Sequence, residues 1–390
     1  MRCKLGDISE ITKLAGYEFT KYIKYIPDGE IIAVRALNLK NGALVLDDIQ
    51  RISKEVSETL PRSQLHKNDI VLSYTGTLGE CAQIREDGKY HLAPNVCKIT
   101  PNDSVVNPNF LFQYIRCEKF KQTLINYAHG STQPTIPMST IRDIPVDIPD
   151  DLEKQGKIAA ILSILDEKIA INRAINDNLE QQAKALYKDW FLDFSPFSSD
   201  GTLPEGWRIG TVGDIIQLHD SKRVPLSGTE RSKMAKLYPY YGATSLMDYV
   251  DNYLFDGIYL LLGEDETVVD NLGFPILQYV YGRFWVNNHA HIITGKEGFS
   301  VEELYLFFGL TNIKSIVTGA VQQKVSQQNL KKVPAIIPSS TALSSFDELI
   351  QPIFSQIRNL RDENARLTSL RDTLLPKLMS GELDVSAVEL

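Results

Sequence analysis

The sequence predicts an α+β protein in which two similar, strand-rich domains with short helices are separated by two long antiparallel coiled-coil helices. Three repeats support this prediction. A seam of regularly spaced side chains within residues 151–193 returns when 188 is added to each number. A polar, proline-bounded segment before each seam repeats at a spacing of 189, and Leu5-Gly-Asp-Ile8 matches Val212-Gly-Asp-Ile215. A repeat this long indicates a duplicated domain with a pseudo-twofold internal symmetry rather than a solenoid.

The two seams alternate steps of four and three, the spacing of side chains that face a partner helix in a coiled coil. The first consists of Ile158, Leu162, Leu165, Ile169, Asn172, Asn176, Leu179, Ala183, Leu186 and Trp190. The second consists of Phe346, Ile350, Ile353, Ile357, Leu360, Asn364, Leu367, Arg371, Leu374 and Leu378. Asn176 and Asn364 share one seam position, where a buried amide fixes the register at some cost in stability. The residues expected to pair the helices or dock a partner are Leu165, Ile169, Asn176, Leu179, Leu186, Trp190, Ile353, Ile357, Asn364, Leu367 and Leu374.

The length also predicts more than one domain, because 390 residues exceed the size at which a single core keeps growing. We expect a first domain over 1–150, a central long helix over 151–195, a second domain over 196–340, and a C-terminal long helix and tail over 341–390. At about 1.5 Å per residue, the helical stretch 158–190 is about 50 Å long, more than one turn of B-DNA at roughly 34–36 Å. A helix of this length could separate two DNA-reading domains.

In the first half, short apolar runs bounded by turn residues predict buried strands at Ile31–Val34 and Asp69–Ser73. Lys40-Asn-Gly-Ala43 predicts a tight turn between strands. Apolar residues at helical spacing predict one helix over 109–124. The prolines of Ile144–Pro149 predict an extended strand that leaves the domain.

The second half follows the same plan from Trp207 to about Pro338. Strands are predicted at 257–262, 274–280 and 291–294. A helix is predicted around 300–310, and the last helix over about 345–375. Within that last helix, Pro352 should introduce a kink and Pro376 should end it.

Composition narrows the function classes. The net charge of −8 argues against strong, salt-driven DNA binding by the chain alone, but not against base reading by a subunit whose partners contact the phosphates. The four cysteines (Cys3, Cys81, Cys97 and Cys117) lack metal-type spacing and are typical of buried thiols in a reducing compartment. The sequence contains neither an apolar run long enough to span a bilayer nor an N-terminal secretion signal, so we expect a cytoplasmic protein without membrane contact.

Enzyme motifs are missing from the sequence. It has no Gly-x-x-x-x-Gly-Lys-Ser/Thr phosphate loop, because Thr75–Glu80 lacks the lysine, and no Gly-x-Ser-x-Gly elbow or amino-methyltransferase signature. His289-Ala-His291 places two imidazoles on one face of a strand, but a metal site needs further ligands. Asp69 and Glu80 could serve a nuclease only with a supporting lysine, which is absent at a suitable spacing. We therefore predict no metal site and no catalytic residue.

Polar loops recur at matching places in the two halves. Their amide, hydroxyl and cationic groups match those that contact base edges and phosphates. The candidate DNA contacts are Arg35, Lys40, Ser73, Tyr74, Thr75, Asn95, Ser131, Thr132, Gln133, Lys222, Arg223, Thr244, Arg283, Gln322, Gln323 and Lys324. Any single one of them is more often an ordinary solvated turn residue. Taken together they favour two related readers of different sequences, because the halves share a framework while these loops differ.

Several motifs resemble those of one known family. They are Gly130–Ile136 followed by Ile144–Pro149, the helical Leu186–Phe191, Tyr241–Thr244 with Asn287–His291, and the tail Leu370–Gly381. On these residues the chain resembles the specificity subunit of Type I restriction-modification systems, over essentially its whole length.

The resemblance implies a heteromeric DNA-binding complex. Each of two target-recognition domains would read one half of a split double-stranded DNA site, and the helices would act as a spacer that docks modification (methyltransferase) subunits, expected to be two. Those subunits would bring S-adenosylmethionine, and restriction/translocase subunits would bring ATP and Mg²⁺, so this chain would bind no cofactor. No catalytic residue of the family maps onto this chain, which implies a non-catalytic recognition subunit.

Two other classes stay open at this point. The chain could be a self-contained nuclease or DNA methyltransferase, or a coiled-coil scaffold with two protein-binding domains. We also expect Tyr187, Phe191 and Leu192, which lie beside or near the seam, to offer apolar surface to a partner.

Overall fold

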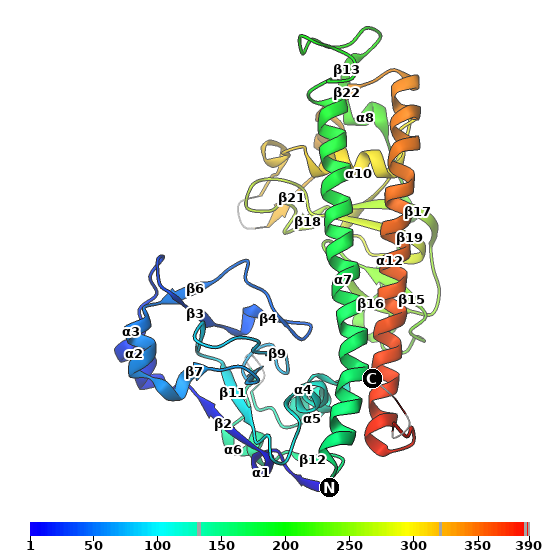
Figure 1. Cartoon of the computed structure of the whole chain (residues 1–390). Helices are drawn as coiled ribbons and strands as arrows, with labels where there is room; N and C mark the ends of the chain where they lie inside the picture. The colour runs from blue at the N-terminus through cyan, green and yellow to red at the C-terminus, as the bar shows by residue number, and fades with distance from the viewer. Residues whose placement is uncertain (131–133, 320–321, 386–387, 389–390) are drawn as a thin grey trace. The chain divides into compact units, whose positions relative to one another are not determined.

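The computed structural model describes residues 1–130, 134–319, 322–385 and 388, and divides the chain into two compact units. Unit 1 comprises Met1–Ile171 and Glu363–Leu390, and unit 2 comprises Asn172–Asp362. The two long helices, α7 (Leu152–Phe191) and α12 (Ser340–Ser380), each contribute one part to each unit (Figure 1). The two long helices expected from the seams are therefore confirmed.

The described residues of the globular part of unit 1 form four small sheets, one of which is the pair β4-β5. Two have four strands, in the orders β2-β11-β8-β9 and β6-β3-β10-β7, and β1 pairs with β12. The strands are β1 (Arg2–Lys4), β2 (Ser9–Lys13), β3 (Ile31–Val34), β4 (Leu39–Lys40), β5 (Ala43–Leu44), β6 (Gln50–Ile52), β7 (Gln64–Leu65), β8 (Ile70–Ser73), β9 (Cys81–Gln83), β10 (Tyr90–Leu92), β11 (Val96–Pro101) and β12 (Pro145–Asp147). The helices are α1 (Leu5–Ile8), α2 (Gly16–Tyr22), α3 (Lys54–Thr59), α4 (Pro108–Arg116), α5 (Glu118–Asn126) and α6 (Met138–Asp143), with 3₁₀ turns η1 (Ala36–Asn38) and η2 (Pro61–Ser63).

Unit 2 has one six-stranded sheet in the order β14-β20-β17-β19-β15-β16, and two strand pairs, β13-β22 and β18-β21. The strands are β13 (Arg208–Thr211), β14 (Ile216–Leu218), β15 (Tyr238–Tyr241), β16 (Leu246–Val250), β17 (Phe255–Gly263), β18 (Asp265–Glu266), β19 (Leu277–Val286), β20 (Ala290–Gly295), β21 (Gln323–Lys324) and β22 (Pro334–Ile337). The helices are α8 (Val212–Ile215), α9 (Gly228–Arg231), α10 (Val301–Gly309) and α11 (Gln327–Lys331), with 3₁₀ turns η3 (Asp220–Lys222) and η4 (Lys314–Ile316).

The two globular parts share one framework. The antiparallel order β2-β11-β8-β9 of unit 1 matches β14-β20-β17-β19 of unit 2, and in each unit the first strand pairs with the exit strand. α4 and α10 follow the equivalent strands β11 and β20. The units differ beyond this framework: unit 1 builds a second sheet, whereas unit 2 extends the first sheet through the parallel pair β15-β19. The prediction of a duplicated domain is confirmed.

The long helices complete both hydrophobic cores in a twofold manner. In unit 1, Ile158 of α7 and Leu375 of α12 lie in the core of the domain. In unit 2, Phe346 of α12 and Tyr187 of α7, the positions related to these by 188, do the same. Each domain therefore folds against the start of one long helix and the end of the other.

Several sequence expectations for individual elements are confirmed. The strand at Ile31–Val34 is β3, the second predicted strand is β8, and the exit strands are β12 and β22. Asn41 and Gly42 have φ values of 54° and 81°, the left-handed pair that the tight turn between β4 and β5 requires. The helix expected near 300–310 is α10.

Two predicted helix boundaries are wrong. The single helix expected over 109–124 is two helices, because Cys117 is extended and its Sγ accepts a hydrogen bond from the backbone N–H of Phe120 at the start of α5. The last helix begins at Ser340 and passes Pro376 to end at Ser380. Burial of Leu375 and Leu378 in the core of unit 1 holds the helical turn around Pro376, which outweighs the missing hydrogen bond.

Candidate nucleic-acid interface

The same edge of the shared sheet carries a polar loop cluster in each unit. In unit 1 the loop after β8 meets the segment before α6, through the backbone pairing of Thr75 with Thr135. In unit 2 the loop after β17 forms β18, which pairs with β21 so that Asp265 lies opposite Lys324. The loops that precede β11 and β20 approach the same edge, because those strands are the neighbours of β8 and β17. Antiparallel pairing thus brings three segments together in each domain.

In unit 1 this edge holds an open pocket of about 510 Å³. It is lined by Tyr25, Arg35, Ala36, Leu37, Leu39, Thr75, Gly76, Thr77, Pro94 and Asn95. Arg35 donates one hydrogen bond of 2.9 Å from Nη2 to the Asp48 carboxylate and another of 2.8 Å to the Asp48 backbone carbonyl. Its Nε is buried and has no hydrogen-bond partner among the described residues. The pocket therefore combines an aromatic ring, a fixed guanidinium with unused donor capacity, and neutral polar groups.

In unit 2 the corresponding edge holds a pocket of about 330 Å³. It is lined by Pro225, Leu226, Arg231, Tyr240, Gly242, Ala243, Thr244, Ser245, Met247, Glu266, Asn287, Asn288 and His289. Asn287 and Thr244 come from the loops that the sequence had singled out. The two pockets share their place in the framework but not their lining residues, as expected of two sites that bind different base sequences.

Three consecutive acids, Glu264 to Glu266, lie at this edge of unit 2, and the first two have partners within the protein. Glu264 accepts a 2.7 Å hydrogen bond from Arg223 and lies 3.5 Å from the Lys324 ammonium. Asp265 lies 2.8 Å from Nδ1 of His289. The Glu266 carboxylate is exposed and contacts neither a cation nor a hydrogen-bond donor within the described parts of the chain. A single free carboxylate therefore lines this pocket.

Beneath this pocket a buried charge network holds the loops together. His291 of β20 is fully buried, with Nδ1 2.6 Å from the Asp220 carboxylate and Nε2 2.8 Å from the Val325 carbonyl. Arg223 donates to the carboxylate of Glu264 and to the backbone carbonyl of Ala290. These groups come from four segments, 220–223, 264, 290–291 and 325, so the network fixes the positions of those segments relative to one another.

This network is also the best arrangement of potential metal ligands among the described residues. Ligand atoms of Asp220, Glu264 and His291 lie within 4.8 Å of one another. The Arg223 guanidinium already contacts both acids, at 3.7 Å and 2.7 Å, and both ring nitrogens of His291 face protein oxygen atoms. The cation that balances these carboxylates is therefore a side chain, and we assign the cluster to structure.

The structure separates the candidate DNA contacts into groups of different accessibility. Exposed candidates are Lys40, Asn95, Lys222, Thr244, Arg283, Gln322 and Lys324. Half-buried candidates are Arg35, Tyr74, Thr75, Arg223 and Gln323. Ser131, Thr132 and Gln133 lie outside the described residues. Of the candidates within the described residues, Arg35, Thr75, Asn95 and Thr244 line the two edge pockets.

Two candidates are poorly suited to contact DNA. Ser73 is fully buried, and its hydroxyl donates to the Thr77 carbonyl and accepts from the Glu80 backbone N–H. Arg223 is engaged by four internal acceptors of the buried network. The sequence suggested that both side chains would project from their turns toward DNA. In the structure their hydrogen bonds are made within the protein, where they stabilise those turns.

Sequence reasoning missed several lining residues, among them Tyr25, Leu37, Arg231, Tyr240 and Glu266. Tyr25 and Leu37 are exposed apolar side chains beside Arg35, and this spacing gave no periodic signal. Glu266 adopts φ = 70°, which is unusual for a residue other than glycine and is invisible in the sequence.

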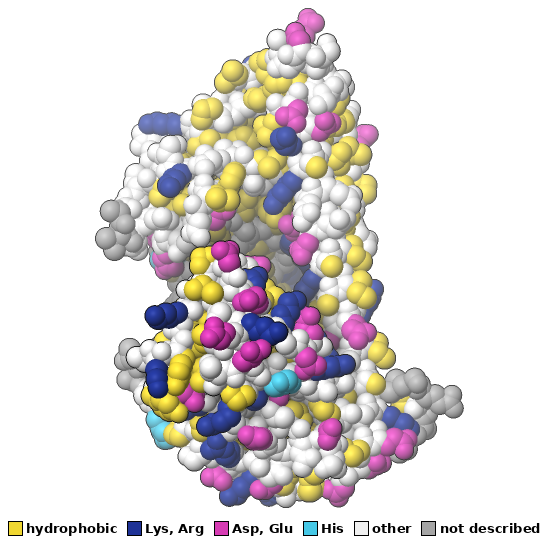
Figure 2. Space-filling view, turned by 60° about the vertical axis from the view of Figure 1, so that its left-hand side comes forward, with side chains coloured by type: hydrophobic (Ala, Val, Ile, Leu, Met, Phe, Trp, Pro, Cys, Tyr) yellow, Lys and Arg dark blue, Asp and Glu magenta, His cyan; other side chains and the backbone are white. Residues whose placement is uncertain are grey.

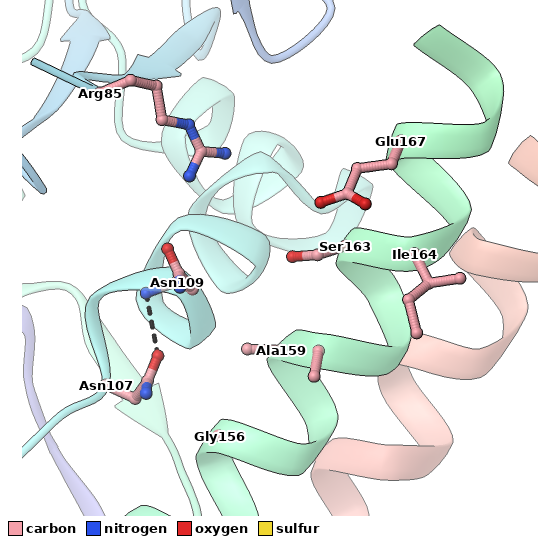
Figure 3. Close-up of a pocket in the computed structure, with 9 residues that line it drawn as sticks. Arg85, Asn107, Asn109, Gly156, Ala159, Ser163, Ile164 and Glu167 are labelled. Carbon is pink, nitrogen blue, oxygen red and sulfur yellow. Dashed lines mark hydrogen bonds between the residues drawn. The ribbon is translucent and has the colours of Figure 1, made fainter. Parts of the chain in front are cut away.

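A further pocket of about 360 Å³ lies in unit 1 between the start of α4 and the first half of α7 (Figure 3). Arg85 and Glu167 lie on opposite sides of it, and its α7 wall includes Gly156 and Ala159. The positions related to those two by 188 are Ser344 and Asp347, which carry larger or charged side chains. The α7 wall of this pocket therefore differs in sequence from the equivalent surface of α12.

Paired charges fix the long helices to the domains. In unit 1, Asp166 of α7 accepts hydrogen bonds from Arg116 of α4 at 2.5 Å and from Arg371 of α12 at 2.9 Å. In unit 2, Glu180 of α7 accepts hydrogen bonds from Tyr305 of α10 at 3.0 Å and from Arg361 of α12 at 2.8 Å. In unit 1, Lys168, which follows Asp166, contacts Glu363, which precedes Arg371. In unit 2, Tyr187, which follows Glu180, contacts Phe346, which precedes Arg361. The two helices are therefore antiparallel within each unit.

The eleven residues expected to pair the helices are all buried or half-buried. Asn176 is 7% exposed and Asn364 is half-buried. Tyr187 and Phe191, in contrast, are buried in the core of unit 2, where both rings contact Phe346, so neither ring offers the apolar docking surface expected from the sequence. Leu192 alone of those three is exposed.

The surface charge is mixed. On the face that Figure 2 shows, Lys and Arg side chains of the described residues alternate with Asp and Glu side chains instead of forming one basic surface. This agrees with the net charge of −8 and with a protein that does not bind DNA by charge alone. Within the described residues, neither long helix nor any other is apolar enough over a sufficient length to cross a membrane.

Comparison with known proteins agrees with the fold and the paired sites. The family model described as the Type I restriction modification DNA specificity domain matches residues 1–181 and again residues 204–369. The MjaIX Type I restriction enzyme specificity subunit of Methanocaldococcus jannaschii is 27% identical over 317 residues, covering 74% of this chain and 71% of that protein. The HindI specificity subunit of Haemophilus influenzae is 25% identical over 376 residues, covering 75% of this chain and 81% of that protein.

A solved structure has the same fold. The crystal structure of the S subunit of a Type I restriction-modification system from M. genitalium aligns with a TM-score of 0.51 and 17% identity, covering 97% of this chain and 96% of that one. The two family matches fall on the two domains that share a sheet framework and a pocketed edge. The chain belongs to the Type I restriction-modification DNA specificity family, and its role is DNA recognition through two copies of the family's domain.

Proposed function

We propose that each unit of this chain reads one half of a bipartite DNA site through the pocket at the edge of its shared sheet. The observation that supports this most strongly is the equivalent position of the two pockets combined with their different linings. A duplicated scaffold conserves the way a domain docks on DNA, and different side chains at the docking edge select different bases. The two half-sites should therefore differ in sequence.

The chain supplies recognition, while its partners supply chemistry and much of the phosphate contact. The mixed surface charge favours this division, because a subunit with a net charge of −8 gains little from counterion release. We propose methyltransferase subunits, two in number, as the partners that carry S-adenosylmethionine. Restriction subunits that carry ATP and Mg²⁺ would complete the assembly in the reducing interior of the cell.

The long helices serve as spacer and as the docking surface for the methyltransferase subunits. Ile164 and Ile171 of α7 are each 55% exposed, an unusual exposure for isoleucine on a helix, and in unit 1 they lie seven residues apart on one face. Replacing both by glutamate should abolish co-purification with the methyltransferase subunit, while Lys154→Glu on the same helix should not. Retained co-purification of the double variant would exclude this surface.

The proposed function is tested by mapping methylated sites in cells that express the chain with its methyltransferase subunit. The expected result is one motif with two different half-sites separated by unspecified bases. Methylation or cleavage of DNA by the purified chain alone would instead support the self-contained enzyme, the alternative left open by the sequence. An assembly without sequence-dependent protection of DNA would support the protein-binding scaffold.

A further inference from the structure

Glu266, whose carboxylate is free in the pocket of unit 2, has an unusual backbone conformation. Glu266 adopts φ = 70°, in the left-handed region that favours glycine. It is the third residue after β17 ends at Gly263. The third residue after β8 ends at Ser73 is Gly76, with φ = 78°. The shared framework therefore requires a left-handed residue here, and unit 2 places a glutamate where unit 1 has glycine.

The surroundings of Glu266 do not explain this choice by internal contacts. Its backbone pairs with Gln323 in the β18-β21 ladder, and its carboxylate is without a partner among the described residues. Its two acidic neighbours, in contrast, contact Arg223, Lys324 and His289. The framework explains the left-handed backbone but not the glutamate, because its side chain makes no internal contact to offset the strain; such residues are typical of binding sites.

A carboxylate is also a costly group to bring close to DNA, because the phosphates repel it. It becomes favourable only where it accepts a hydrogen bond from a base. The major groove offers such donors at the exocyclic amino groups of cytosine and adenine. Adenine also presents its N7 acceptor beside the amino group, which repels the second carboxylate oxygen, whereas cytosine presents only the donor.

We infer that Glu266 is a specificity-determining residue that accepts a hydrogen bond from N4 of a cytosine in the half-site read by unit 2. This inference rests on the proposed function and assigns one base pair of that half-site, a C·G pair, to one side chain. Other groups that line the pocket, such as Asn287 and Thr244, are available for neighbouring bases.

The test compares three variants in the complete modification complex, with methylated sites mapped in cells and melting temperatures measured on the purified chains. Glu266→Gln replaces an acceptor by an amide, which matches adenine, and Glu266→Gly removes the side chain while suiting the left-handed backbone. Glu297→Gly is the matched control, because Glu297 is also exposed and left-handed, with φ = 53°, but is not among the residues that line the pocket.

Glu266→Gln should shift one C·G position of one half-site toward A·T, and Glu266→Gly should lose roughly tenfold or more of the preference at that position. The other half-site and the gap should be unchanged in both variants. Glu297→Gly should leave every base of the recognition motif unchanged. Both glycine variants should melt no lower than the wild-type chain, so a change of letters in Glu266→Gly cannot be ascribed to unfolding.

Unchanged letters in both Glu266 variants would overturn the inference and leave the proposed function intact. So would an affected position that is an A·T pair in the wild-type motif, or a change spread over the whole half-site. A wild-type complex that yields no two-part motif would overturn the proposed function, and the inference would fall with it.

Discussion

Replacement of Asp166 by asparagine should destabilise unit 1 strongly, because this carboxylate joins three helices. Its oxygens accept hydrogen bonds from Arg116 at 2.5 Å, from Gln113 at 2.7 Å and from Arg371 at 2.9 Å. The side chains of Arg116 and Arg371 are only 14% and 17% exposed. In the asparagine variant, two poorly hydrated guanidinium groups stay near each other and lose the negative charge that both contact.

The magnitude follows from this burial. Breaking a fully buried ion pair by removing one partner costs about 3–5 kcal/mol. Asp166 is 22% exposed and Arg371 keeps a second contact with Asp372, so we reduce the expected loss to about 2–3 kcal/mol. With a urea m-value of about 2–3 kcal/mol/M, the unfolding midpoint of unit 1 should fall by about 1 M.

The assay can distinguish the two units, because Trp190, Trp207 and Trp285 all belong to unit 2. Urea unfolding of the full chain should show an earlier circular dichroism transition in Asp166→Asn and a smaller shift of the tryptophan fluorescence transition. Glu167→Gln is the matched control, since it removes the same charge from the exposed neighbouring position. Equal midpoints for the two variants would refute the conclusion that this network holds α4, α7 and α12 together.

Three further predictions concern stability and spacing. Burial raises the pKa of Glu303 to about 8, so the folded state favours the protonated acid, and the free energy of unfolding should fall as pH rises from about 4.5 toward 8. Urea titrations at several pH values should show this loss, on the order of a few kcal/mol, in the wild-type chain and not in Glu303→Gln. Glu297→Gly should raise the free energy of unfolding by up to about 1 kcal/mol, because glycine relieves the strain of the left-handed backbone. A lower melting temperature would contradict this. One heptad added to both α7 and α12 should lengthen the unspecified gap by about three base pairs, since seven residues add about 10.5 Å, and a methylation motif with the original gap would exclude the spacer role.

The duplicated architecture could be predicted from the sequence because equivalent residues recur at a constant offset. The seam residues recur at a fixed offset, and a burial pattern that repeats in the sequence repeats in space: Ile158 and Phe346 occupy equivalent places in the two cores. Short strands and the turn at Asn41-Gly42 were predictable for a local reason, since apolar runs and left-handed turn residues determine them without distant partners.

Expectations failed where distant contacts override local preference. Pro376 should end a helix on local grounds, but burial of the adjacent Leu375 keeps the helix intact. Tyr187 lies beside the predicted seam yet belongs to the core of unit 2, because the domain itself packs on that face of α7. Arg223 is a sensible base contact by residue type, and only the structure shows the internal acceptors that it satisfies.

The pockets could be located only in part from the sequence. The loops that carry Thr75, Asn95 and Thr244 were identified, since they follow or precede predicted strands. Their convergence with Tyr25 and Arg231 depends on how the sheet orders its strands. The left-handed conformation of Glu266 could not be predicted, because neither composition nor residue spacing indicates the φ of a glutamate.

The central claim is that two equivalent domains read two half-sites independently. The most direct measurement replaces the second domain, residues 208–337, by the corresponding segment of another specificity subunit and maps the methylated sites of the resulting complex. The account predicts a motif in which one half-site changes to new letters while the other half-site and the gap stay as they were. A change in both half-sites, or in neither, would contradict it.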